Sequence, residues 1–269
     1  MAYGRDNVLY HARLTANTAQ GAVVPLALQD GIENVRQGYG SAKLKSVKAY
    51  FAKKSTDTNA IPAIPVEIKN SNWVDSAGLS AQDFTKDTAL SKNSLAHMRG
   101  RDKELLPNSS WIINATMPAA WTYNASTAPY LDIYVLIEIE YSAVQGINTE
   151  NASGSPVMKQ AINASVTGSA NVPVGIGTFD NLLQGVTYIL SEVSEPLGVT
   201  GEAQFLIVEG FSAQAGLKRI IPIKADGMAE QIEGSVYLTK QTYNLKVISN
   251  VALSGTAVTV NMEMIASTN

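Results

Sequence analysis

The chain has 269 residues, of which 16% are charged, and its net charge at pH 7 is −3. This length allows one large β domain or two ordinary domains, each able to bury a core. The sequence contains no cysteine, which excludes disulfides, thiolate metal sites and a thiol nucleophile. Neither half of the chain has the basic excess on which phosphate binding relies, so we expect no sequence-specific nucleic-acid partner.

The first 20 residues are predicted to form a separate N-terminal segment. They lack the apolar core of a signal peptide, and no stretch of the chain approaches the ~20 apolar residues of a membrane-spanning helix. We therefore expect the protein to be made in a cytoplasm. Asn-x-Ser/Thr triplets are then chance matches rather than glycosylation sites; they begin at Asn108, Asn114, Asn124, Asn151 and Asn163.

Three short strands are predicted next, at residues 22–28, 44–52 and 64–74, because Gly, Asp and Asn turns separate apolar runs there. Pro62 and Pro65 place the third strand at a sheet edge or at a strand start. Lysines gather on the second strand and are interpreted as a solvated face; they are Lys43, Lys45, Lys48, Lys53 and Lys54.

Residues 80–98 differ in character and are predicted to contain one or two short helices. Ser80 can cap a helix, and Phe84, Leu90 and Leu95 recur loosely at helical spacing. A polar loop at residues 99–108 follows. We expect these helices to be insertions that project from a β scaffold.

A linker is predicted at residues 146–156, a Gly, Asn and Ser stretch without apolar periodicity. It separates a first domain at 21–145 from a second at 157–269. Strands of the second domain are predicted at 157–166, 186–193, 203–209, 217–224, 234–239, 245–252 and 257–266. A short helical turn is expected at 179–183.

A repeated pattern indicates that the two domains are alike. Residues 131–143 and 256–268, about 125 positions apart, each form a long alternating strand, and each follows an apolar run that ends in a turn. Short strands joined by frequent turns favour a sandwich or jelly roll, and the lack of crossover helices disfavours a parallel α/β fold. The sequence therefore predicts an all-β fold of two tandem jelly rolls with short helical insertions.

Candidate catalytic residues are few. The chain has two histidines, His11 and His97, and neither has a neighbouring acid or serine pattern from which to build a triad. Glu138 and Glu140 lie two apart on one strand face, as the acid and nucleophile of some jelly-roll glycanases do. The third acid of such motifs is missing, so a solvated or interface face is the favoured interpretation.

Ligand sites are equally sparse. Gly175, Gly177 and Gly185 match no phosphate-binding loop and are interpreted as turns. Calcium loops of the Asp-x-Asp-x-Asp-Gly form do not occur, although Asp180 with Asn181 could contribute to a cation site built from distant loops. The larger aromatic residues are interpreted as core or interface packing, with Trp121 and Tyr123 as the best candidates for ligand contact; they are Trp73, Trp111, Trp121, Tyr123 and Tyr130.

Two jelly rolls in tandem, with strands ending near Ala143 and Ala266 and a linker near Gly154, resemble the double jelly-roll major capsid proteins of the adenovirus-like lineage. In size the chain is similar to the minimal members found in corticoviruses, which are membrane-containing marine bacteriophages. The resemblance covers the whole chain. It is one of architecture and size, since no position matches a family signature, and it assigns no role to any residue.

The resemblance implies a structural protein, not an enzyme, that assembles as homotrimers into an icosahedral virion shell over an internal membrane. It implies synthesis in a host cytoplasm, contacts with other capsid, vertex or membrane proteins, and structural Ca²⁺ without any other cofactor. The N-terminal segment, with Val8, Leu9 and Leu14 among Arg5 and Arg13, would lie near lipid at the capsid base. The alternative for this segment is a flexible terminus lying across the core.

Two other classes of function stay open. One is a non-catalytic adhesion or carbohydrate-binding β module of a phage or cell surface, which an exposed aromatic platform would favour. The other is a jelly-roll glycan-active enzyme, in which Glu138 or Glu140 would be essential for turnover.

Overall fold

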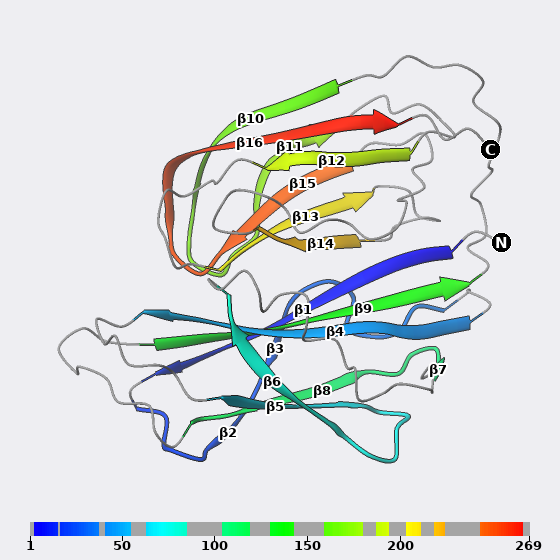
Figure 1. Cartoon of the computed structure of the whole chain (residues 1–269), viewed down its shortest axis with the longest axis vertical. Helices are drawn as coiled ribbons and strands as arrows, with labels where there is room; N and C mark the ends of the chain where they lie inside the picture. The colour runs from blue at the N-terminus through cyan, green and yellow to red at the C-terminus, as the bar shows by residue number, and fades with distance from the viewer. Residues whose placement is uncertain are drawn as a thin grey trace. The chain divides into compact units, whose positions relative to one another are not determined.

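The computed structural model describes residues 3–15, 17–37, 41–54, 63–84, 104–118, 130–142, 159–179, 187–193, 203–210, 218–223 and 243–265. Every helix or strand within these ranges is a β-strand, which confirms the predicted all-β fold (Figure 1). The chain divides into two compact units. We call Asn7–Glu140 the N-terminal unit, and Met1–Asp6 together with Tyr141–Asn269 the C-terminal unit.

The first nine strands build the sheets of the N-terminal unit. They are β1 (Tyr3–Thr15), β2 (Val23–Pro25), β3 (Ala27–Asp30), β4 (Ser41–Lys54), β5 (Ile64–Asn70), β6 (Ala77–Asp83), β7 (Glu104–Leu105), β8 (Trp111–Thr116) and β9 (Tyr130–Ser142). Neighbouring strands follow the order β2-β8-β5-β6-β4-β9-β1-β3, and β7 pairs with β4. The contact between β6 and β4 is a short parallel pairing, Tyr50 with Gln82 and Phe51 with Asp83.

This order is that of a jelly roll. Apart from the short edge strand β3, the strands form one layer β1-β9-β4-β7 and a second layer β2-β8-β5-β6. Strands that follow one another in the chain therefore alternate between layers, except for β5 and β6, which both lie in the second layer, and this is the pattern of a jelly roll. The first and last strands of the unit, β1 and β9, lie side by side in the first layer.

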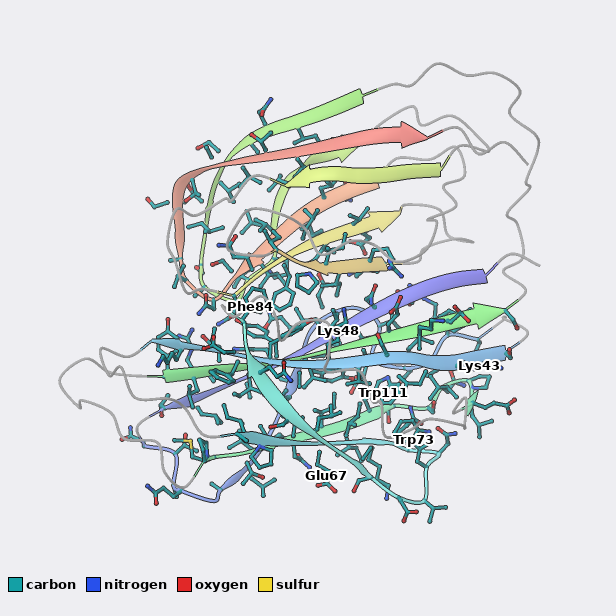
Figure 2. The ribbon with its side chains drawn as sticks, in the orientation of Figure 1. Lys43, Lys48, Glu67, Trp73, Phe84 and Trp111 are labelled. Carbon is teal, nitrogen blue, oxygen red and sulfur yellow. The ribbon has the colours of Figure 1, made fainter. Side chains whose placement is uncertain are left out.

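The core of the N-terminal unit follows from the alternation of β5 and β8. Ile64, Val66 and Ile68 of β5 are buried, while the residues between them are exposed or half-buried. On β8, Trp111 is buried, and its ring lies 5.5 Å from that of Trp73 in an edge-to-face contact. Figure 2 shows Trp111 and Glu67 on opposite sides of this layer.

The C-terminal unit repeats the same order. Its strands are β10 (Lys159–Gly168), β11 (Val174–Phe179), β12 (Thr187–Val193), β13 (Gln204–Gly210), β14 (Lys218–Pro222), β15 (Tyr243–Ser249) and β16 (Leu253–Ile265). They form the sheets β10-β16-β12 and β11-β15-β13-β14, which correspond strand for strand to β1-β9-β4 and β2-β8-β5-β6. The predicted tandem repeat is confirmed, because its two copies fall on the equivalent strands β9 and β16.

The N-terminal segment differs most from the prediction. Residues 3–15 form β1, which pairs with both β9 and β3 inside the sheet. Val8, Leu9 and Leu14 are at most 1% exposed, so they are unavailable to lipid and do not belong to a flexible terminus. The strand was not recognised in the sequence because the ionisable residues Tyr10, His11 and Arg13 interrupt these apolar residues.

Two other local predictions were wrong. Gly175 and Gly177 lie within β11 rather than in turns, and the pairing with β15 shifts register between them. A side chain at Gly177, whose φ is 154°, would approach Ile162 Cγ2 to 2.9 Å, so a larger residue there would require Ile162 to move. Ser80 lies in β6 and starts no helix.

The remaining predictions agree with the structure or fall outside it. Pro65 is the second residue of β5, a strand start as predicted. Part of the predicted polar loop at 99–108 forms β7. The rest of the predicted helical insertion (85–98), the linker at 146–156, the helical turn at 180–183 and the strand at 234–239 lie outside the described residues.

Candidate functional site

Strand β9 carries three carboxylates on one face, and each contacts a neighbouring strand. Ser46 Oγ on β4 donates a hydrogen bond of 3.0 Å to Glu138 Oε2. Lys45 Nζ, also on β4, lies 3.8 Å from Glu140 Oε2. The two glutamates that could have formed an acid and nucleophile pair are therefore half-buried groups that join β9 to β4.

The third carboxylate, Asp132, is the centre of a buried polar cluster that also contains His11 and Arg13 of β1. Arg13 Nε and Nη2 donate hydrogen bonds of 2.9 and 2.8 Å to the two carboxylate oxygens. His11 Nε2 lies 2.7 Å from Oδ1. Because an ionised carboxylate can only accept, His11 is the donor in this contact. Side-chain exposure falls from 33% at Arg13 to 13% at His11 and 0% at Asp132.

Two tyrosines enclose this cluster. The Arg13 guanidinium carbon lies 3.8 Å above the centre of the Tyr130 ring, a cation–π contact. The His11 ring lies 4.8 Å from that of Tyr134, which is fully buried. The rings shield part of the charged groups from water, most fully at Asp132, and this strengthens their interaction.

The electrostatics follow from this geometry. Burial raises the pKa of Asp132, but the hydrogen bonds from His11 and Arg13 lower it by more, so the pKa lies below its ordinary value. The hydrogen bond to Asp132 raises the pKa of Arg13 above its ordinary value. Burial raises the pKa of Tyr134 well above its ordinary value. Asp132 and Arg13 are therefore ionised, and Tyr134 is neutral, at neutral pH.

The cluster joins the first strand of the N-terminal unit to its last strand. A bidentate arginine–carboxylate pair fixes both the distance and the orientation of its partners, and the histidine adds a third bond to the same carboxylate. His11 has no acidic neighbour in the sequence, as noted above, but the fold brings Asp132 to it from 121 residues away. The arrangement supports a structural role, in which β1 is held in register against β9.

A second charged cluster lies in the C-terminal unit. Glu209 of β13 is 2.8 Å from Lys246 Nζ of β15 and 3.4 Å from Lys218 Nζ of β14. Burial raises the pKa of Glu209, but the two lysines lower it by more, so it lies below its ordinary value. This glutamate joins three adjacent strands across one face of the sheet.

The other predicted site residues are either in the core or outside the described ranges. Trp73 and Trp111 are buried, as predicted, and Tyr130 packs against Arg13. His97, Trp121, Tyr123, Asp180, Asn181 and Gly185 lie outside the described residues. Among the residues that the structure does describe, no group of three or more His, Asp or Glu side chains could hold a metal ion. No helix in those ranges is long and apolar enough to cross a membrane.

The second layer of the N-terminal unit has an outward face that mixes polar residues with a few exposed apolar ones. The layer β2-β8-β5-β6 buries alternate residues in the core, and the residues between them point outwards. Val23 of β2 is 62% exposed and Ile112 of β8 is 53% exposed. We call this surface, formed by the outward residues of the four strands, the outer face.

The comparisons with known proteins give few relatives. No protein-family model and no curated protein matches the chain. Among solved structures, the chain is similar to a T=1 particle of Penaeus vannamei nodavirus, with 15% identity, 100% coverage of both chains and a TM-score of 0.26. It is also similar to two structures of infectious bursal disease virus. The structure of the Gx strain has 10% identity and a TM-score of 0.22, and the match covers 100% of this chain and 74% of that chain. The structure of the T13 particle has 9% identity and a TM-score of 0.19, and the match covers 98% of this chain and 78% of that chain. Because these TM-scores are low, the jelly-roll assignment rests on the strand order alone.

Proposed function

We propose that this protein is a structural subunit of a virus capsid, which assembles with copies of itself into a shell. The observation that carries the proposal is the repetition of one jelly-roll strand order in two tandem units of a single chain. Jelly rolls recur in capsid and lectin domains. A tandem pair supplies two similar building blocks per subunit, which suits a shell built from one kind of protein.

The site geometry is compatible with this role. The buried charges of the N-terminal unit hold its own strands together, as His11, Arg13 and Asp132 do. Glu138 and Glu140 contact β4 instead of forming an open catalytic pair. Units whose buried charges are paired internally are compatible with self-assembly, in which surface is buried between subunits.

We propose that the subunits form homotrimers, that the trimers build an icosahedral shell of the adenovirus-like double jelly-roll lineage, and that the shell encloses a membrane and contacts vertex or membrane proteins of the virion. Structural Ca²⁺ belongs to the proposal as a condition to be varied, because the described residues do not provide a set of ligands for it.

The test is the mass of the purified full chain in solution, measured by light scattering with Ca²⁺ and with a chelator, followed by electron microscopy. A particle of three times the chain mass, which forms larger shells at high concentration, is the expected result. A monomer at every concentration and in both buffers would refute the proposal. Retention of such a monomer on a polysaccharide column would support a carbohydrate-binding module instead.

A further inference from the structure

One short segment of chain closes the sheet of the N-terminal unit. β2 pairs with β8 at one end of the strand order, and β3 pairs with β1 at the other end. Leu26 alone separates β2 from β3. Residues 22–30 therefore bridge the two ends of the strand order, and we call this segment the strap. Gly21 and Gly31 flank it with φ angles of 74° and 107°, and glycine is the residue that adopts such angles most readily.

Main-chain hydrogen bonds attach both halves of the strap. β2 lies antiparallel to β8, and next to it Leu26 N donates a hydrogen bond of 2.8 Å to Ile113 O. β3 lies antiparallel to β1, with Leu28 opposite Tyr10. Each of these main-chain bonds contributes little net free energy, because an open strap would form equivalent bonds with water. The strength of the attachment therefore depends on what the side chains add.

The side chains of the strap add little to its attachment. Leu26 is 7% exposed and is the one buried side chain of residues 22–30. Val23, on the outer face, and Leu28 are both exposed, whereas Val66, an inward residue of β5 in the same sheet, is 1% exposed. Segments with few buried apolar contacts open at a low cost in free energy, and core strands open only when the whole unit unfolds. By this criterion the strap is attached more weakly than β5.

We propose that the strap opens as one piece while the rest of the N-terminal unit stays folded. Leu26 is the common anchor of β2 and β3, so its release frees both halves, and Gly21 and Gly31 provide the hinges. Opening uncovers the edge of β8 and the edge of β1 together. Uncovered strand edges can pair with an added strand. The strap is thus a conformational device that controls access to these two edges, whatever assembly the protein forms.

Because the chain contains no cysteine, the opening can be measured with a single introduced thiol. Leu26→Cys places that thiol at the anchor of the strap, and its rate of reaction with excess dithionitrobenzoate follows the opening. Val66→Cys is the matched control, because Val66 is buried within β5. We expect Leu26→Cys to react at least about 100-fold faster than Val66→Cys. Its rate should also depend less on urea, because opening of the strap exposes less surface than unfolding of the unit.

A disulfide tests whether the two halves of the strap open together. Leu26 and Ile113 form a hydrogen-bonded pair, and hydrogen-bonded and non-hydrogen-bonded pairs alternate, so Val23 and Thr116, three positions away, form a non-hydrogen-bonded pair. The Cα separation of such a pair, about 4.5 Å, suits a disulfide. Oxidation of the double variant Val23→Cys with Thr116→Cys locks the β2 half. Amide hydrogen exchange in β3, relative to that in β5, should then be at least about tenfold slower than in the reduced variant.

Two results would overturn the proposal. Equal reaction rates and equal urea dependence for Leu26→Cys and Val66→Cys would show that the strap opens only with the whole unit. Unchanged exchange in β3 after oxidation would show that the two halves open separately. Amide exchange in the natural chain is a test without any substitution, since the strap amides should exchange faster than those of β5 and with a smaller urea dependence. Thermal unfolding of each variant checks that the unit remains folded.

Discussion

Replacing Arg13 by Gln removes the guanidinium partner of the buried Asp132 carboxylate and leaves the His11 hydrogen bond in place. Breaking a fully buried ion pair costs about 3–5 kcal/mol, because the remaining charge stays in a medium of low polarity. Arg13 is 33% exposed, so solvent already screens part of the interaction. The loss of the Tyr130 contact adds about 0.5–1 kcal/mol. We expect Arg13→Gln to destabilise the N-terminal unit by about 2–4 kcal/mol.

Urea unfolding followed by tryptophan fluorescence measures this loss in one unit. The chain has 3 tryptophans, Trp73, Trp111 and Trp121, and all of them fall within the range of the N-terminal unit. With an m-value of about 2 kcal/mol/M, the midpoint should fall by about 1–2 M. Arg13→Lys keeps the charge but loses the bidentate geometry, so its midpoint should lie between those of Arg13→Gln and the natural chain.

Lys45→Gln provides the control, since Lys45 is 46% exposed and lies 3.8 Å from Glu140 in a surface pair. It should change stability by less than about 0.5 kcal/mol. The reasoning would be refuted if Arg13→Gln changed stability no more than Lys45→Gln. The double variant of Arg13→Gln with Asp132→Asn gives a second check, because a coupled pair should lose about 1–3 kcal/mol less than the sum of its single variants.

Two further predictions concern acid and backbone geometry. The folded-state pKa of Asp132 is lowered, so its contribution to stability is present above the ordinary carboxyl pKa of about 3.9 and is lost as the pH falls from there through the folded value. Between neutral pH and pH 3, Asp132→Asn should therefore lose less stability than the natural chain in the same fluorescence assay; equal losses would contradict the assignment. Gly31→Ala should destabilise the N-terminal unit by about 2 kcal/mol or more, because φ is 107° and the new Cβ would lie 2.9 Å from the Asn7 carbonyl oxygen. Gly21→Ala is the control, with a φ of 74° but no atom within 4 Å; if both variants lose the same stability, the close approach has no cost.

The sequence was informative wherever one face of a strand meets the core and the other meets solvent. β5 alternates in burial as its apolar residues alternate in sequence, and a strand was predicted there. β8 alternates in the same way but was noted only as an apolar run before the first long strand. The repeat was visible for the same reason, because β9 and β16 are long strands at equivalent places. The fold class also followed from the spacing of the strands, since short strands without crossover helices leave few arrangements other than a sandwich or jelly roll.

The candidate site was not predictable in the same way. From Leu131 to Ile137, β9 is buried on both faces, so Asp132 is in the interior although its position in the alternation suggested solvent. Its partners come from β1, which was not predicted as a strand because polar residues interrupt its apolar pattern. Each half of the cluster resembles an ordinary surface residue in the sequence, and only the pairing of β1 with β9 shows that the charges compensate one another.

Because β1 and β9 are neighbours in the sheet but far apart in the sequence, β1 cannot pair with β9 until most of the N-terminal unit has been synthesised. The first strand leaves the ribosome early, but its partner Asp132 follows His11 by 121 residues. At a synthesis rate of about 5–20 residues per second, β1 waits about 6–24 s with Val8, Leu9 and Leu14 uncovered. During this interval the edge of β1 that pairs with β9 is open, even if β3 has already paired with the other edge, and an open strand edge favours association with other unfinished chains.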